Sequence, residues 1–498
     1  MTAAQQDRQA RPAHQAHRDH RPSAPAPVRQ WWKDAVVYQI YPRSFKDSNG
    51  DGIGDLEGIR SKLDYLQALG VDVLWLSPIY ASPQADNGYD IADYYDIDPM
   101  FGTLSDFDRL LESVHERGMR LVMDLVVNPS SDENPWFVES RSSRESPKRD
   151  WYIWRDPRPG CVGGEAGAEP NNWGSFFSGS AWAWDEATGQ YYLHLFHKKQ
   201  PDLNWENPEV RQAVFQMMRW WLDRGIDGFR MDVINLISKP ELADGPVAPG
   251  ATISYEARMV ADGPRMHDFL GEMKREVLDG QNLLTVGETP MVTVEKAAEY
   301  THPETGELSM VFQFEHVGLD HGPGGRFDRR EWSWVAYKEN VTRWDKGIGE
   351  GWNSLYLENH DQPRSVSRMG DDSPRFREAC AKTLGSVLHL QRGTPYIYQG
   401  QELGMTNYPF EALGDFRDIE SLSFFAEATA SGVPAEALLP ALAWGSRDNA
   451  RTPMQWSSQV NTGFSETGPW IAVNPNHVEI NAADQIRDQE SVFHHYRR

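Results

Sequence analysis

Cysteine is almost absent from this chain of 498 residues. The two cysteines, Cys161 and Cys380, are too few for a disulfide framework or a cysteine-rich zinc cluster. Two free thiols are typical of a reducing compartment, so we expect a cytoplasmic protein. Long apolar runs are also missing, and no stretch reaches the roughly 20 residues that a membrane-spanning helix needs. We therefore expect no membrane partner.

Positive charge is scarce as well. The chain has 49 Lys and Arg against 73 Asp and Glu, which gives a formal net charge of -24. Such a balance excludes nucleic acid and anionic membrane surfaces as natural partners. A cation site or a small neutral ligand is more compatible with it. We expect a monomer or a homodimer.

The apolar runs that are present are short and regularly placed. Helix-like segments separate them, including residues 59–69, 107–117 and 210–224, each of which ends just before a glycine or close to one. Short continuous apolar runs are typical of buried parallel strands. Eight of them predict an α/β fold of the TIM, or (β/α)8, barrel type. The predicted strands are residues 35–41, 71–76, 120–127, 228–233, 283–286, 310–314, 354–357 and 396–398.

The spacing of these runs divides the chain into parts. Residues 1–30 are rich in Ala, Gln, Arg, His and Pro and are interpreted as a disordered tail. Residues 31–129 form the first part of the barrel, and 130–200 an inserted subdomain between strand three and helix three. Residues 201–486 complete the barrel, with an insertion after strand eight at about 405–455. Residues 487–498 look like the start of a helix, and we expect them to begin a truncated C-terminal region that would continue into a β-domain.

Arg230 and Asp232 interrupt the fourth apolar run. Side chains two residues apart on a strand point to the same face. Buried charges are costly unless they are paired or used, so this pair is either a structural ion pair or the floor of an active site.

Further carboxylates follow the ends of other predicted strands, which converge at one face of a barrel. Asp232, Glu288 and Asp361 stand out, and the chain contains no Gly-x-Ser-x-Gly, phosphate-loop or His-Glu-x-x-His motif. Two carboxylates on either side of an acetal perform glycoside hydrolysis. Arg230 would keep Asp232 ionised, as a nucleophile requires. Glu288 has no basic sequence neighbour, which suits a general acid.

Five longer motifs resemble those of one enzyme family. They are Asp124-Leu-Val-Val-Asn128, Gln200-Pro-Asp-Leu-Asn-Trp-Glu-Asn207, Gly228-Phe-Arg-Met-Asp-Val233, Val286-Gly-Glu-Thr289 and Asn359-His-Asp-Gln-Pro-Arg364. Through them, residues 31–498 are similar to glycoside hydrolase family 13, the α-amylase superfamily. The likeness is to its oligo-1,6-glucosidase and α-glucosidase branch.

This resemblance implies a role for each matching residue. Asp232 would be the nucleophile of a retaining mechanism, Glu288 the general acid/base, and Asp361 the carboxylate that stabilises the transition state. A pair of Asp86 and Arg447 would block longer chains and make the enzyme exo-acting. The implied substrate contacts are Asp86, Tyr89, Phe177, Phe196, Gln200, Arg230, Val233, His360, Arg364 and Arg447.

The predicted function is release of glucose from the non-reducing end of short α-gluco-oligosaccharides. Val233 after the nucleophile resembles enzymes that prefer α-1,6 linkages, although a β-branched strand residue is the plainer interpretation. The alternatives are an α-1,4-glucosidase or transglucosylase, and a sucrose or trehalose-6-phosphate hydrolase. A non-catalytic transporter subunit is disfavoured, because the chain keeps all three carboxylates.

The chain departs from the family pattern at Pro129, where the family has a histidine that donates a hydrogen bond to the reacting glucose. Proline has no side-chain donor, so one contact should be missing.

The loop Asp47-Ser-Asn-Gly-Asp-Gly-Ile-Gly-Asp55 places oxygen atoms at alternate positions, like the first part of an EF-hand. The resemblance implies a structural Ca²⁺, with Mg²⁺ as the alternative ion; an Asx-rich turn without an ion is the other interpretation. The implied ligands are Asp47, Asn49, Asp51, Asp55 and the carbonyl of Ile53.

Overall fold

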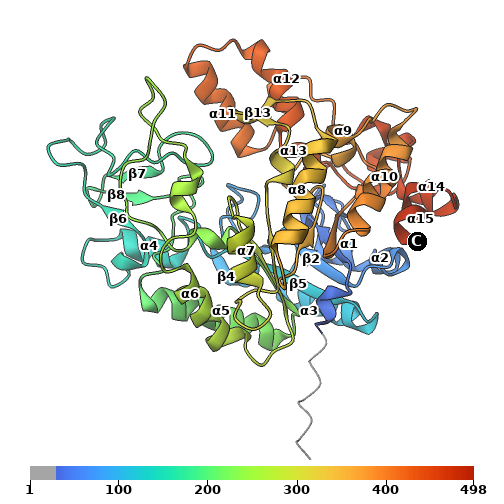
Figure 1. Ribbon diagram of the computed structural model, residues 1–498, viewed down its shortest axis with the longest axis horizontal. Coiled ribbons are helices and arrows are strands. Elements are labelled where there is room, and N and C mark those ends of the chain that lie inside the picture. The colour runs from blue at the N-terminus through green and yellow to red at the C-terminus, as the bar shows by residue number, and fades with distance from the viewer. Residues whose placement is uncertain (1–29) are drawn as a thin grey trace, which may run out of the picture.

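Eight parallel strands form one sheet at the centre of the computed structural model, which describes residues 30–498 (Figure 1). In sheet order they are β11 (Met310–Phe312), β10 (Leu284–Glu288), β9 (Gly228–Met231), β5 (Arg120–Leu125), β2 (Val73–Leu76), β1 (Val37–Ile40), β15 (Thr394–Tyr398) and β14 (Ser354–Leu355). A parallel bridge between Val311 and Asn353, the residue before β14, brings the two edges together. The predicted barrel is thus confirmed as a nearly closed one.

Helices surround the barrel and connect its strands. They are α1 (Leu56–Arg60), α2 (Leu63–Leu69), α3 (Leu104–Glu116), α5 (Pro208–Arg224), α6 (Met266–Met273), α7 (Val294–Thr301), α8 (Trp334–Gly347), α9 (Ser365–Met369) and α10 (Arg377–His389). The prediction of one helix over residues 59–69 is wrong. The hydroxyl of Ser61 donates to the carbonyl of Gly58 at 2.6 Å, and the segment divides there into α1 and α2.

Alternation along each strand builds two hydrophobic layers. Val37, Val73 and Val122 point into the barrel, where they meet Val286 and Met310. Their strand neighbours point outward and pack beneath the helices in a larger cluster. Both layers are buried on all sides, which explains why the strands appear in the sequence as unbroken apolar runs.

A small antiparallel sheet lies within the predicted insertion of residues 130–200. Its strands are β6 (Trp154–Arg155), β8 (Gln190–Leu193) and β7 (Trp182–Asp185), in that order, and α4 (Pro135–Arg141) precedes them. A separate hydrophobic cluster that includes Trp173, Trp182 and Leu193 supports it. The hairpin of β3 (Tyr80–Ala81) and β4 (Asp93–Ile97) encloses the loop that carries Asp86.

The segment after β15 forms a second addition to the barrel. It contains α11 (Ile419–Ala430), α12 (Ala435–Gly445) and α13 (Asp448–Arg451), and lies beside the hairpin of β12 (His321–Gly322) and β13 (Gly325–Arg329) at the top of Figure 1. Phe410, Phe416 and Leu442 form its own apolar cluster. In the same view this addition lies at the top and the insertion with β6 to β8 lies at the left.

The last two helices are α14 (Ala482–Arg487) and α15 (Val492–Arg497). The predicted helix at the end of the chain corresponds to α15, which packs against α2 and α10 and buries Val492, Phe493 and Tyr496. Across residues 30–498, no helix is long and apolar enough to cross a membrane. The tail predicted for residues 1–30 lies outside the described residues, apart from Gln30.

Candidate active site

Arg230 lies at the centre of the converging strand ends, with only 1% of its surface exposed. Strand register places it beside Asp124 of β5 and Val286 of β10. Its Nη1 atom lies 2.8 Å from Oδ1 of Asp124 and 2.5 Å from Oδ1 of Asp232. Its Nη2 atom lies 2.5 Å from Oε2 of Glu288. One guanidinium therefore holds three carboxylates from three neighbouring strands.

Two details of this cluster are not visible in the sequence. The fourth strand was predicted to run to Val233, but β9 ends at Met231, so Asp232 stands just beyond it. Glu288 has no basic neighbour in the sequence, but it has one in three dimensions. Arg230 reaches it from the adjacent strand, a contact that sequence proximity does not reveal.

Burial and ion pairing act in opposite directions on these acids. Burial raises the pKa of Asp232 well above its ordinary value, while the charge of Arg230 acts against that rise. Burial likewise raises the pKa of Asp124 to about 6, again opposed by Arg230. Arg230 is therefore the group that favours the ionised form of Asp232, as a nucleophile requires.

Asp361 occupies a strongly positive environment. Nη2 of Arg451 lies 2.8 Å from its Oδ1 atom, and Nη1 of Arg447 lies 3.4 Å away. Burial favours the neutral acid, yet the charges of Arg447 and Arg451 hold the pKa of Asp361 well below its ordinary range. The two arginines thus favour the ionised form of Asp361.

Asp86 and Arg447 form the ion pair that the sequence predicted, with Nη2 of Arg447 3.0 Å from Oδ1 of Asp86. Both are buried, and the side-chain amide of Gln200 donates to the other oxygen of Asp86 at 3.2 Å. This pair joins the loop after β2 to the segment after β15.

A hydrogen-bonded chain crosses the floor of the site. Nε2 of Gln39 donates to Nδ1 of His360 at 2.8 Å, which leaves the proton of the neutral ring on Nε2. That atom lies 2.6 Å from the hydroxyl of Tyr89, which in turn donates to Asp124 at 3.0 Å. Burial lowers the pKa of His360 to about 3, so the ring stays neutral.

The insertion supplies an aromatic wall. The rings of Phe177 and Phe196 meet edge to face at 5.5 Å, and the guanidinium of Arg447 lies 4.9 Å from the ring centre of Phe177. Val233, predicted as a linkage determinant, adopts φ 35°. This left-handed conformation is strained for a β-branched residue. It directs the Val233 N–H toward Oε2 of Glu288, 3.2 Å away.

Arg364 does not reach the other predicted site residues. It is fully buried and pairs with Glu358 at 3.1 Å, and it also donates to the carbonyls of Gln399 and Ala450. These contacts anchor the loop after β14, so we remove Arg364 from the substrate contacts. Pro129 is buried, and its backbone bridges to Asp202. Its ring has no hydrogen-bond donor to replace the histidine of the family pattern.

Four residues that contact the predicted site residues were not predicted as site residues from the sequence. They are Gln39, Asp124, Asp418 and Arg451. Gln39 could have been found as the one amide in the run Val37 to Ile40. Asp124 lies within the predicted strand of residues 120–127 and begins a family motif. Arg451 follows Arg447 at the i, i+4 spacing of a helix, which places both on one face. Asp418 had no local signal.

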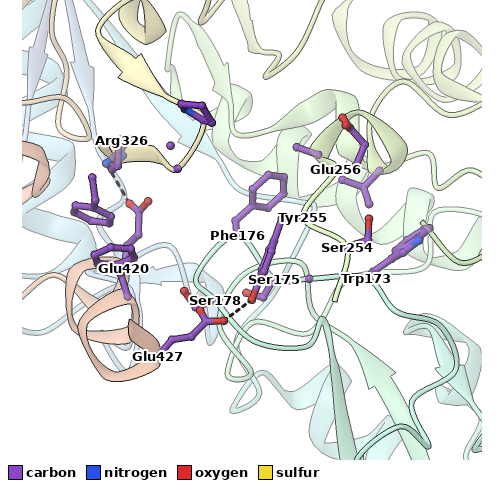
Figure 2. A pocket seen from close by; sticks show the side chains of 18 of the residues that line it. Trp173, Ser175, Phe176, Ser178, Ser254, Tyr255, Glu256, Arg326, Glu420 and Glu427 are labelled. Carbon is purple, nitrogen blue, oxygen red and sulfur yellow. Dashed lines mark hydrogen bonds and ion pairs between the residues drawn. The ribbon is translucent and has the colours of Figure 1, made fainter. Parts of the chain in front are cut away.

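A pocket of about 460 Å³ lies beside the clamp of Asp86 and Arg447, between the insertion and α11 (Figure 2). Phe176, Tyr255 and Trp173 give it aromatic walls, and Glu420 pairs with Arg326 at 3.1 Å. Glu420 also approaches Nε of Arg447 at 3.5 Å, which connects the pocket to the carboxylate cluster.

The loop predicted to hold a metal has oxygen donors of the right kind. Asp47 and Asp55 are buried, and hydrogen bonds from Ser465 and Gly52 lower the pKa of Asp47 although burial opposes them. Among residues 30–498, no three acidic, histidine or cysteine side chains converge closely enough to form a metal centre by themselves. An ion here would therefore also need the amide of Asn49 and the carbonyl of Ile53.

Comparisons with known proteins show the family of the chain. The model of the Alpha-amylase family, described as "Alpha amylase, catalytic domain", matches residues 39–498. The chain is 58% identical over 473 residues to the oligo-1,6-glucosidase of Parageobacillus thermoglucosidasius, covering 94% of this chain and 83% of that protein. It is 53% identical over 475 residues to the glucan 1,6-alpha-glucosidase of Streptococcus dysgalactiae subsp. equisimilis, with the same coverage.

Solved structures with the same fold include enzymes of related chemistry. The crystal structure of an isomaltulose synthase mutant from Erwinia rhapontici with sucrose matches with a TM-score of 0.90 and 47% identity, covering 94% of this chain and 82% of that one. A trehalose-6-phosphate hydrolase mutant of Bacillus licheniformis matches with a TM-score of 0.88, 48% identity and the same coverage.

Proposed function

This chain belongs to the alpha-amylase family of glycoside hydrolases, and we propose that it is a retaining, exo-acting α-glucosidase that releases glucose from short α-gluco-oligosaccharides. The observation that carries this proposal is the joint pairing of Asp232 and Glu288 with Arg230 at the mouth of the barrel. Two carboxyl groups held side by side can act as nucleophile and acid on one glycosidic bond.

Each carboxyl group then has its own step. The carboxylate of Asp232 attacks the anomeric carbon, while Glu288 protonates the departing oxygen and the aglycone leaves. Glu288 next removes a proton from water, which releases glucose from Asp232. Asp361, held as an anion by Arg447 and Arg451, stabilises the positive charge of the oxocarbenium-like transition state.

The ion pair of Asp86 and Arg447 closes the glucose pocket at its far end. Both side chains are buried and 3.0 Å apart, so a longer chain could not pass between them. Only the non-reducing end of a substrate would then fit. The pocket in Figure 2 lies between the insertion and α11, and we assign it to the aglycone because its aromatic rings offer flat faces to a sugar.

We propose α-1,6 linkages as the preferred substrates, as in the oligo-1,6-glucosidases to which the chain is more than half identical. A substrate panel of isomaltose, maltose, sucrose and trehalose-6-phosphate tests this directly. We expect the highest kcat/KM for isomaltose. A higher value for maltose, sucrose or the phosphorylated sugar would replace the proposal with that activity. The cytoplasm stays the proposed compartment, on the ground of the two free thiols.

The loop from Asp47 to Asp55 is proposed to bind a structural Ca²⁺, with Mg²⁺ as the alternative. A bound cation would stabilise the folded protein by mass action. We expect EDTA to lower the melting temperature by several degrees, and excess Ca²⁺ to restore it. The double variant Asp47→Asn, Asp51→Asn serves as the control, because it should melt at the lower temperature with or without EDTA. If EDTA left the melting temperature of the parent protein unchanged, the proposal would be contradicted.

A further inference from the structure

We propose that Asp418 is a positioning residue for the glucose pocket, which acts by holding Arg447 in line with Asp86 and Asp361. Asp418 comes from the segment after β15 rather than from a barrel strand, and it touches neither carboxyl group of the predicted catalytic pair. The inference rests on the proposed function, because it concerns how the clamp of that site is held.

The contacts of Asp418 divide between its two oxygens. Oδ1 lies 2.8 Å from Nε and 2.7 Å from Nη2 of Arg447, and 3.6 Å from Nη1 of Arg451. Oδ2 accepts from the backbone N–H of Ser421 at 3.1 Å and from its hydroxyl at 2.7 Å. Oδ1 also accepts from the backbone N–H of Glu420 at 3.3 Å, so the first oxygen faces the arginines and shares the capping of α11 with the second.

Arg447 is divided among three acids. Its Nη2 atom, which Asp418 holds, is also the atom that contacts Asp86 at 3.0 Å, and its Nη1 atom faces Asp361 at 3.4 Å. Asp418 thus contacts the side of the guanidinium formed by Nε and Nη2, while Nη1 of Arg447 faces Asp361 in the glucose site. Because the long side chain of arginine has many rotamers, contacts on both sides of the guanidinium are needed to fix its orientation.

Burial makes this contact strong. None of the surface of Asp418 is exposed, and Arg447 is 4% exposed, so water cannot take the place of the carboxylate. The other charged groups around the pair are Asp86, Asp361, Arg326, Glu420, Asp448 and Arg451, and the neutral ring of His360 is also near. Without Asp418, Arg447 would be drawn toward these remaining acids and away from its alignment across the pocket.

Asp418 also helps to attach the segment after β15 to the glucose pocket. The backbone N–H groups of Arg417 and Asp418 both donate to Oδ2 of Asp448, at 2.7 and 2.9 Å. The start of α11 is thereby fixed to the residue that follows Arg447. Helix α11, which lines the pocket in Figure 2, and Arg447, which closes the glucose pocket, are thus held together.

The test compares Asp418→Asn with Ser421→Ala. Asparagine keeps the volume and the helix cap but removes the charge, whereas Ser421→Ala removes a capping partner and leaves the charge. For Asp418→Asn we expect the KM for isomaltose and the dissociation constant of glucose, measured by calorimetry, to rise together by about tenfold or more. Ser421→Ala should lower the melting temperature and leave both constants unchanged.

Two results would overturn the assignment. One is an Asp418→Asn enzyme with unchanged KM and unchanged glucose affinity. The other is a rise of the same size in both variants, since docking of α11 rather than the charge of Asp418 would then control the pocket. Turnover of isomaltose by the parent enzyme checks the proposed function separately, because glucose binding is measured without catalysis.

Discussion

Replacing Asp232 by alanine is expected to lower kcat for isomaltose by a factor on the order of 10⁴ or more. The reason is that no other carboxylate can take over the attack. Asp124 is turned toward Arg230, Tyr89 and Trp75, and Asp361 is held by Arg447 and Arg451. The fold should survive, since Arg230 keeps two of its three carboxylate partners.

A matched control for this variant is Asp185→Ala. Asp185 is also fully buried and ion-paired, 2.6 Å from Nε of Arg141, but it lies in β7 of the insertion. We expect Asp185→Ala to lower the melting temperature while the folded enzyme keeps its kcat. Measuring both variants by glucose release and thermal melting separates chemistry from folding. More than about one per cent residual kcat in Asp232→Ala would contradict the nucleophile assignment.

The second large effect is expected for Arg230→Gln, which removes the cation that three buried carboxylates share. Breaking a buried ion pair from one side typically costs about 3–5 kcal/mol, because the remaining charge stays buried without a partner. Since Arg230 opposes the rise in the pKa of Asp232 and Asp124, both pKa values should rise further in the variant.

The sign of the pH dependence follows from that rise. An acid whose pKa is higher in the folded state than in the unfolded state adds stability at low pH, and this stability is lost as the pH rises through the folded pKa. The stability deficit of Arg230→Gln should therefore be smallest near pH 4 and grow toward neutral pH. The acid limb of kcat/KM should move to higher pH, since the nucleophile must be ionised.

Urea unfolding at several pH values, together with pH–rate profiles, measures both effects. Arg211→Gln is the control, because Arg211 pairs with Glu272 at 2.6 Å on the outer helices, away from the site. It should lose stability without moving the acid limb. If the acid limb of Arg230→Gln stayed at the pH of the parent enzyme, Arg230 would not control the ionisation of the nucleophile.

The barrel could be predicted because each of its strands is buried on both faces. That burial requires an apolar run, and an apolar run is visible without knowledge of its neighbours. Asp232, Glu288 and Asp361 could be found for a related reason, since each follows such a run. The boundary at Met231 could not, because the apolar run continues through Val233 and Ile234 although the backbone leaves the sheet.

What the sequence did not reveal are contacts between distant segments. Glu288 meets Arg230 across strands, and Arg451 meets Asp361 across 90 positions of the chain. Nothing local shows that the segment after β15 folds back over the barrel mouth and brings Asp418 to Arg447. Arg364 illustrates the opposite error, since it shares a motif with Asp361 yet pairs with Glu358 in the interior.

The most direct test of the central claim is the anomer of the glucose first released from p-nitrophenyl α-glucoside, whose leaving group is not a sugar, followed by proton NMR before mutarotation. If Asp232 attacks and Glu288 acts first as acid and then as base, two inversions occur and the first product is α-glucose. Initial appearance of the β-anomer would mean a single displacement by water, and would contradict the roles of Asp232 as nucleophile and Glu288 as acid and base.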